Sequence, residues 1–161
     1  MIIYKPYKVI KNHEVVVKAV FDLNNKREEL WFSFHKDYEK YIVTENADAF
    51  LIGLLLLAMK KGTDINVQSQ ISAKLYYQLN HYLINALYLA NNEWKKIKIN
   101  VESVNNKDLC TEFAVGTGIS CGVDSFATIC DHLHEIDDFK IDYFTFFNAG
   151  SHGGFGGDKA R

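Results

Sequence analysis

The segment from residue 116 to residue 125 constrains the fold of this chain more than any other, because it predicts a strand that turns tightly into a helix. Residues 113–119 predict the strand, and an amphipathic stretch from Asp124 to about His134 predicts the helix. β-branched and aromatic residues predict a second strand at 141–147. Strand, helix and strand in this order are typical of a unit built on a parallel sheet.

The turn itself, Ser120-Cys121-Gly122-Val123-Asp124-Ser125, has the chemistry of an anion site. Unpaired backbone N–H groups converge where a strand turns into a helix, and the positive end of the helix dipole adds to them. Gly122 allows close approach of the backbone or a positive φ, and the hydroxyls of Ser120 and Ser125 can donate to phosphate oxygens. Asp124 is suited to cap the helix or to hold Mg²⁺. The turn therefore predicts a phosphate-binding loop.

This turn resembles the loop of the PP-loop ATP pyrophosphatases, which carry Ser-Gly-Gly-x-Asp-Ser after the first strand of a Rossmann-like sheet. Asparagine synthetase and GMP synthetase belong to that superfamily. Ser120, Gly122, Asp124 and Ser125 match the motif, whereas Cys121 stands in place of its first glycine. A side chain at that position either crowds the phosphate or demands a different backbone angle.

The resemblance implies ATP and Mg²⁺ as cofactors. Ser120, Cys121, Gly122, Val123, Asp124 and Ser125 would bind the pyrophosphate end of ATP, with Asp124 as the metal ligand. Asn148, Gly150 and His152 follow the second strand, where the family places residues near the adenosine. The implied reaction is adenylation of an oxygen on a small molecule or modified base with release of pyrophosphate, followed by amidation or thiolation. The acceptor and the catalytic residues stay unassigned.

Several alternatives stay open for the same residues. The turn can be a simple helix cap, since Ser, Asp and Gly are common in caps and turns. Cys121 can be a nucleophile activated by the helix N-terminus. The domain can also be a non-catalytic nucleotide-binding or interaction module. A metal site at Cys130 and His134, one turn apart on the predicted helix, is the weakest alternative, because two ligands rarely suffice.

The first hundred residues predict strands and two helices. Residues 15–21 and 29–34 predict a hairpin around a turn at 22–26. Asn46 is the expected N-cap of a buried helix that ends at Gly62. Apolar residues at every fourth position predict a second helix over residues 71–91 with Ser69 as its cap. The alternation of apolar and polar residues over 97–101 predicts a strand.

The expected fold class is therefore α/β, with a Rossmann-like parallel sheet of PP-loop type at residues 109–161, preceded by an α+β domain at 1–104. A polar break at 105–108 separates them. The second part holds one strand–helix–strand unit, too little for a doubly wound sheet, so we expect the natural chain to continue and this fragment to be inactive.

Composition limits the partners. With 18 basic and 20 acidic residues, no large net field points toward nucleic acid or an anionic membrane. The longest apolar run, residues 47–59, is shorter than the roughly 20 residues that span a bilayer. No secretory signal is visible at the start, and the odd count of three cysteines lacks a Cys-x-x-Cys pair, so a cytoplasmic protein without a disulfide framework is expected.

Nucleic acid is therefore an unlikely partner. One alternative is RNA binding through a basic strand face, formed by residues Trp94, Lys95, Lys96 and Lys98. Alternating lysines on a strand are usually a solvated face.

Overall fold

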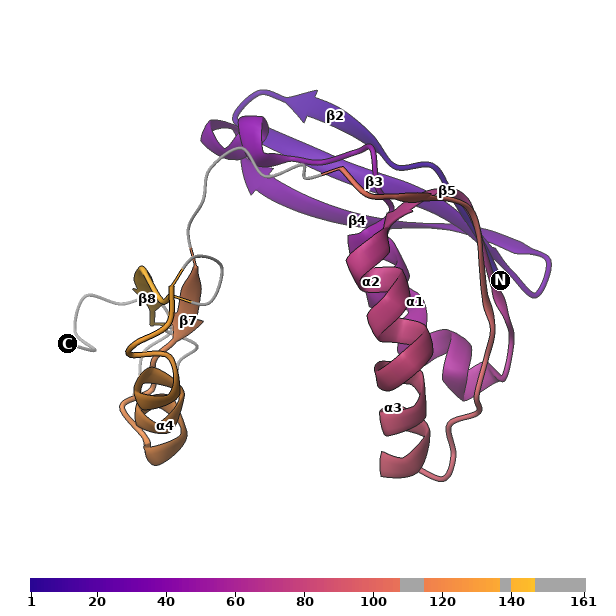
Figure 1. Ribbon diagram of the computed structural model, residues 1–161. Coiled ribbons are helices and arrows are strands. Elements are labelled where there is room, and N and C mark those ends of the chain that lie inside the picture. The colour runs from indigo at the N-terminus through magenta and orange to yellow at the C-terminus, as the bar shows by residue number, and fades with distance from the viewer. Residues whose placement is uncertain (108–114, 137–139, 147–161) are drawn as a thin grey trace, which may run out of the picture. The chain divides into compact units, whose positions relative to one another are not determined.

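The computed structural model describes residues 1–107, 115–136 and 140–146. It divides the chain into two compact units, Met1–Leu109 and Cys110–Arg161. The first unit contains a mixed sheet with helices packed on it, and the second contains two short parallel strands and a helix (Figure 1). The described chain is thus a mixed α/β protein.

A six-stranded mixed sheet organises the first unit. Its strands are β1 (Ile2–Tyr4), β2 (Tyr7–Lys11), β3 (Glu14–Leu23), β4 (Lys26–His35), β5 (Ile65–Ser72) and β6 (Ile99–Asn105). The order is β2-β3-β1-β5-β6, and β4 pairs with β3 along its full length. β2, β3 and β4 are antiparallel, whereas β1, β5 and β6 are parallel to one another. The two patterns meet where β1 pairs with both β3 and β5.

The predicted hairpin is confirmed as β3 and β4, and both strands are longer than expected. Its turn tightens to Asn24 and Asn25, which both adopt positive φ, 52° and 63°. Two successive residues with positive φ are the signature of a type I′ turn, whose twist matches that of the flanking strands. Asparagine tolerates this backbone conformation better than most residues. The register follows from the turn, with Leu23 opposite Lys26.

The first helix, α1 (Asp48–Lys61), ends as predicted at Gly62, which adopts φ 63°. Its N-terminus differs, because Ala47 occupies the cap position without a side-chain hydrogen bond. Asn46, the expected cap, instead bridges to Gln70 of β5 and accepts a hydrogen bond from the Asn105 side chain at 3.0 Å. The asparagine therefore joins strand ends rather than capping the helix.

The predicted helix at 71–91 is shortened by a strand that the prediction missed. Residues 65–71 alternate between buried and exposed side chains, so β5 runs to Ser72. Ser69 lies on this strand with its hydroxyl buried, and no described residue hydrogen-bonds to it. Ser72 is the actual cap, because its Oγ accepts from the Leu75 amide at 3.3 Å. The helix then runs through α2 (Ala73–Gln78), the π-helical segment η2 (Leu79–Leu83) and α3 (Ile84–Ala90).

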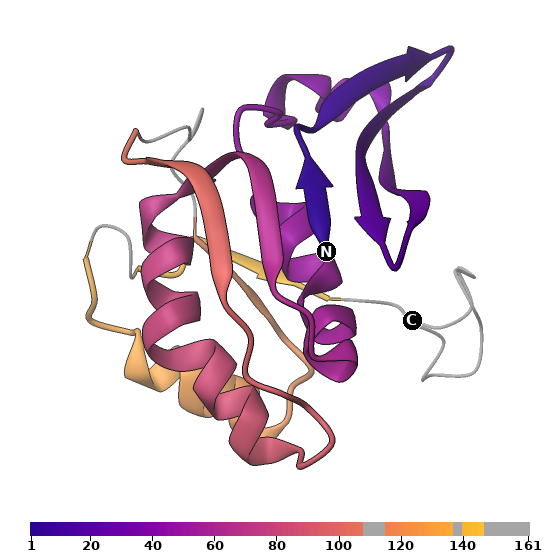
Figure 2. The ribbon, with the colours of Figure 1, turned by 90° about the vertical axis from the view of Figure 1, so that its right-hand side faces the viewer.

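β6 begins at Ile99, two residues later than predicted, and continues to Asn105. The helical segment from Ala73 to Ala90 connects β5 to β6, and these two strands pair in parallel. Figure 2 shows this strand–helix–strand arrangement beside α1. Residues 1–104 therefore combine a parallel strand–helix–strand arrangement and an antiparallel hairpin in one mixed sheet. The core lies between sheet and helices and includes Ile3, Phe21, Phe50, Leu51, Met59, Ile65, Ile71, Leu79 and Ile99.

The second unit confirms the predicted strand, helix and strand in shorter form. It consists of β7 (Gly116–Gly118), α4 (Val123–Asp131) and β8 (Tyr143–Thr145), with the two strands parallel. None of the described residues of this unit is fully buried. Its apolar side chains are instead exposed, including those of Phe126, Leu133, Tyr143, Phe144 and Phe146. Apolar surface of this kind gains stability when further protein covers it.

Within the described ranges, no helix combines the length and the apolar character needed to cross a membrane.

Candidate functional site

The loop between β7 and α4 is held to the sheet next to it. The Ile119 amide donates to the Thr145 carbonyl at 3.0 Å, so the strand pairing continues to the residue before Ser120. Gly122 is the N-cap of α4, and its carbonyl accepts the first hydrogen bond of the helix, from the Phe126 amide at 3.2 Å. The loop therefore spans only the few residues between a paired strand and a helix.

The positive φ of the loop lies at Cys121, not at Gly122. Cys121 adopts φ 59°, whereas Gly122 has φ −86° and ψ 172°, an extended conformation open to any residue. For an L-residue other than glycine, the left-handed region costs about 1–2 kcal/mol. The position where the resembling motif has its first glycine thus has the backbone angle that favours glycine. Cys121 therefore places a side chain on a backbone angle that is strained for any residue other than glycine.

Two hydroxyl groups close the loop on itself. The Ser120 amide donates to Ser125 Oγ at 3.0 Å, and the two Oγ atoms lie 3.0 Å apart, within hydrogen-bonding distance. Each hydroxyl has one proton, and one of the two is used between them. The pair therefore keeps one O–H for a ligand, where the sequence predicted two.

The N-terminus of α4 supplies further donors. The amides of Val123, Asp124 and Ser125 precede the first intrahelical hydrogen bond and so have no acceptor in their own helix. No side chain caps the helix, and the Val123 side chain is 84% exposed. These amides, with the positive end of the helix dipole, favour an anion.

Asp124 lies in the first turn of α4, and its backbone carbonyl accepts from Thr128 Oγ1 at 3.0 Å. Within the described residues, no group of three or more His, Cys, Asp or Glu side chains is placed to hold a metal. Mg²⁺ commonly binds through one or two carboxylates together with substrate phosphates. Asp124 can therefore contribute one ligand to a metal that arrives with a nucleotide.

The other predicted site residues fall into two groups. Asn148, Gly150 and His152 lie outside the described residues. Cys130 and His134 do not share a helix, because α4 ends at Asp131, which corrects the premise of a metal site there.

The basic strand face is also corrected. Trp94 packs against the core, and Lys96 places its Nζ 4.8 Å from the ring centre of Tyr88. Lys95, Lys96 and Lys98 precede β6, which starts at Ile99. They therefore do not line a strand, and Trp94 is partly buried against the core.

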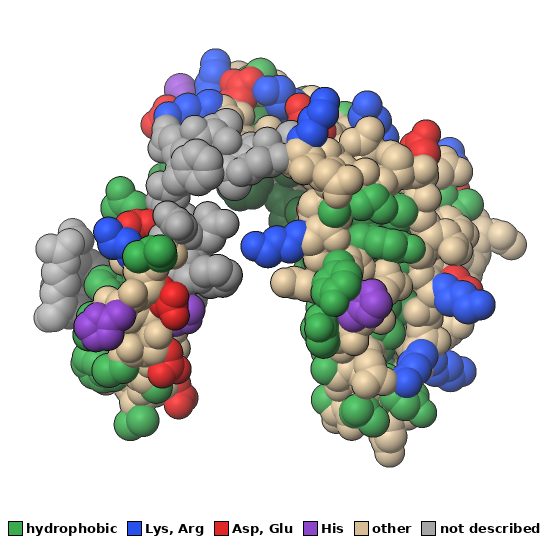
Figure 3. All heavy atoms as spheres, viewed as in Figure 1, with side chains coloured by type: hydrophobic (Ala, Val, Ile, Leu, Met, Phe, Trp, Pro, Cys, Tyr) green, Lys and Arg blue, Asp and Glu red, His purple; other side chains and the backbone are tan. Residues whose placement is uncertain are grey.

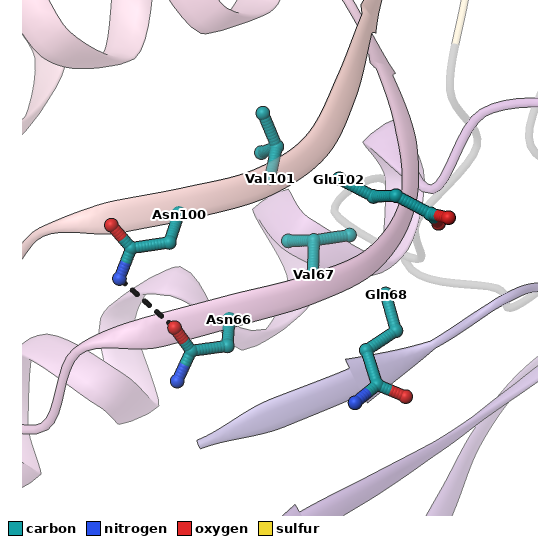
Figure 4. A pocket seen from close by; sticks show the side chains of 6 residues that line it. All are labelled: Asn66, Val67, Gln68, Asn100, Val101 and Glu102. Atoms are coloured by element: carbon teal, nitrogen blue, oxygen red, sulfur yellow. Dashed lines mark hydrogen bonds between the residues drawn. The ribbon is translucent and has the colours of Figure 1, made fainter.

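A pocket with polar side chains lies on the sheet between β5 and β6 (Figure 4). It measures about 450 Å³ and is lined by Asn66, Val67, Gln68, Asn100, Val101 and Glu102. The Asn100 side chain donates to Asn66 Oδ1 at 2.9 Å. The strand register shifts at this point, between Val67 and Gln70. The hydrogen bond between the two asparagines uses one N–H of the Asn100 amide and the Oδ1 of Asn66, and the side chains of Gln68 and Glu102 also line the pocket.

The fold and the loop define an α/β protein with a candidate phosphate site at a strand–helix turn. Comparison of the chain with protein-family models, with curated proteins and with solved structures found no match.

Proposed function

We propose that the chain is part of an ATP-dependent enzyme of PP-loop type, with the phosphates of Mg·ATP bound by the loop from Ser120 to Ser125. A substrate oxygen attacks the α-phosphate, the bond to the β-phosphate breaks, and pyrophosphate leaves. A nitrogen or sulfur nucleophile then displaces AMP from the adenylated substrate. The acceptor is a small molecule or a modified base.

One observation supports this proposal above the others. The Ser120–Ser125 hydrogen bonds fold the loop so that the free amides at the start of α4 and the remaining hydroxyl proton belong to one short turn. The backbone of Gly122 leaves its α-carbon bare beside them. An added Cβ there would lie 3.4 Å from Ser120 Oγ, so glycine is not required by packing within the protein. A bare α-carbon is useful where a phosphate approaches the backbone.

Product analysis tests the chemistry. Full-length protein with Mg·ATP and candidate acceptors should give AMP and pyrophosphate, whereas ADP and phosphate would exclude PP-loop chemistry. Asp124→Asn should weaken the binding of Mg·ATP more than the binding of ATP alone. Asp131→Asn, at the other end of the same helix, is the matched control and should change neither.

A non-catalytic nucleotide-binding module is the second candidate, and the strained Cys121 favours it. A side chain at a position that favours glycine can block the geometry of turnover while phosphate contacts with backbone amides remain. This candidate predicts binding of AMP or ATP without any cleavage.

A further inference from the structure

The sheet of the first unit has one apolar face and one polar face. In β5 the residues that belong to the core alternate with Asn66, Gln68 and Gln70, which are exposed. Parallel strands are usually covered on both faces and are then apolar on both. The second face of β5 and β6 is instead polar and open, so it suits contact with water or with a ligand that forms hydrogen bonds.

The surface over the helices has the opposite character. Apolar and aromatic side chains gather over α2 and α3 (Figure 3), among them Tyr82, 62% exposed, and Leu89, 73% exposed. Apolar surface of this kind is typical of contacts with other protein. The polar face of the sheet therefore calls for a different class of ligand.

The pocket between β5 and β6 collects the free polar groups of this face (Figure 4). The hydrogen bond from Asn100 to Asn66 leaves the amide nitrogen of Asn66 and the amide oxygen of Asn100 available. Gln68 and Glu102 lie two positions further along the two strands, and neither side chain has a hydrogen-bond partner among the described residues. The nearby shift in strand register bends the two strands around these groups.

The lining of the pocket disfavours most classes of ligand. None of the described residues that line it is Lys or Arg, so it lacks the cations that bind the phosphates of nucleotides and nucleic acids. Glu102 is the one charged side chain of the lining, which is too few for a metal site. An apolar ligand would leave the amides and the carboxylate unpaired. The pocket therefore suits a neutral ligand whose groups both donate and accept hydrogen bonds.

We propose that this face binds a neutral oligosaccharide, with the hydroxyl groups of one end in the pocket. Each sugar hydroxyl has one proton to donate and lone pairs that accept. The hydroxyls donate to Glu102 and to the amide oxygen of Asn100, and they accept from the amide nitrogens of Asn66 and Gln68. A carboxylate acceptor makes its hydrogen bond stronger than a neutral one does.

Trp31 supplies the apolar part of the same surface. Directly paired residues point to one face of a sheet, and the register relates Trp31 to Lys18, and Asp22, four positions from Lys18, to Ile2 and then Asn66. The indole is 58% exposed, and it can stack on the C–H groups of a sugar ring. From the strand spacing, it lies about 15 Å from Gln68, a span that takes a chain of several sugar units.

Titration of the full chain with neutral tetrasaccharides tests the proposal, with cellotetraose, maltotetraose and mannotetraose as probes. At millimolar concentrations at least one should shift the side-chain amide resonances of Asn66, Gln68 and Asn100 in nuclear magnetic resonance spectra. Gln68→Ala should weaken binding about fivefold. Gln70→Ala is the matched control, since it changes the same residue type on the same strand face outside the pocket. No shift with any probe, or an equal loss with both variants, would overturn the proposal.

Two further variants test the parts of the site separately. Trp31→Ala should weaken binding of the tetrasaccharide about fivefold and leave binding of the matching disaccharide unchanged, because only the longer ligand reaches the indole. An equal loss for both lengths would contradict the extended site. A tetrasaccharide that carries a uronic acid should bind more weakly than its neutral counterpart, and Glu102→Gln should remove this difference. Equal binding of the two sugars by the wild-type protein would contradict the placement of ligand beside Glu102. Circular dichroism of each variant checks that the fold is retained.

Discussion

The amide of Ser120 donates to the hydroxyl of Ser125 across 3.0 Å, five residues further along the chain. This hydrogen bond links the end of the strand to the first turn of α4. It fixes the course of the four residues between Ser120 and Ser125, where the candidate anion site lies. The loop is therefore ordered by its own hydrogen bonds, before any ligand is bound.

Ser125→Ala should loosen this loop. The change removes the acceptor of the Ser120 amide and leaves the Ser120 hydroxyl without its partner, a loss of about 1 kcal/mol. Hydrogen exchange at the Ser120 amide should become about fivefold faster. Thr128→Ala is the control, because its hydroxyl bonds to the Asp124 carbonyl inside the helix. Equal effects of both changes would show that helix stability, and not the loop contact, is being measured.

Cys121→Gly should stabilise the turn, since it relieves a positive φ of 59°. The gain is about 0.5–1 kcal/mol, because the more flexible unfolded chain offsets part of the relief. The measurement is exchange of the α4 amides, which should slow down. Cys121→Ala keeps the strained angle and removes the thiol, so it should give no gain. If alanine stabilises the turn as much as glycine, strain is not the cause.

Gly62→Ala should destabilise the first unit by about 1–2 kcal/mol. Gly62 has φ 63°, and an added Cβ would lie 2.5 Å from Cδ of Lys95. Denaturant unfolding of the variant measures the loss. Adding Lys95→Ala removes the steric contact but not the strained angle, so the double variant should recover only part of the stability. Full recovery would assign the whole cost to the contact.

Stability at acidic pH should depend on Asp22. Hydrogen bonds from Arg27 Nε at 2.8 Å and from the Tyr4 hydroxyl at 2.7 Å lower the pKa of Asp22 to about 2. In the unfolded chain the pKa of this carboxyl is about 3.9. The contribution to stability is therefore complete above the unfolded pKa and is lost as the pH falls toward 2. Asp22→Asn should flatten the loss of stability in this window, as measured by unfolding at each pH. Glu28→Gln, at an exposed residue of β4, is the control and should leave the slope unchanged.

The sequence predicted those elements in which one local pattern stands alone. The runs of β-branched and aromatic residues in 15–21 and 29–34, with a turn between them, predicted β3 and β4, and Gly62 predicted the end of α1. In β5, Asn66, Gln68 and Gln70 are exposed and alternate with buried residues. The strand was missed because this alternation is followed directly by apolar residues at every fourth position, starting at Ile71. Ile71 satisfies both patterns, and the parallel pairing with β6 decides between them.

The position of the candidate site in the chain could be predicted, but the backbone dihedral angles of its loop could not. Ser, Gly and Asp at this spacing predicted a turn from strand into helix. The left-handed residue is Cys121, although Gly122 is the residue that local preference would choose. The hydroxyl pair was not predictable either, because it depends on how tightly the loop closes between Ser120 and Ser125.

The most direct test of the nucleotide site is the affinity of full-length protein for Mg·ATP by calorimetry, compared with the affinity of Gly122→Val. The φ of −86° at this position is open to valine, so the fold should persist while the new methyl groups occupy the approach of the phosphate. The account predicts that the wild-type protein binds Mg·ATP and that Gly122→Val does not, with both equally folded by circular dichroism. Equal binding by the two proteins, or no binding by the wild-type protein, would contradict it.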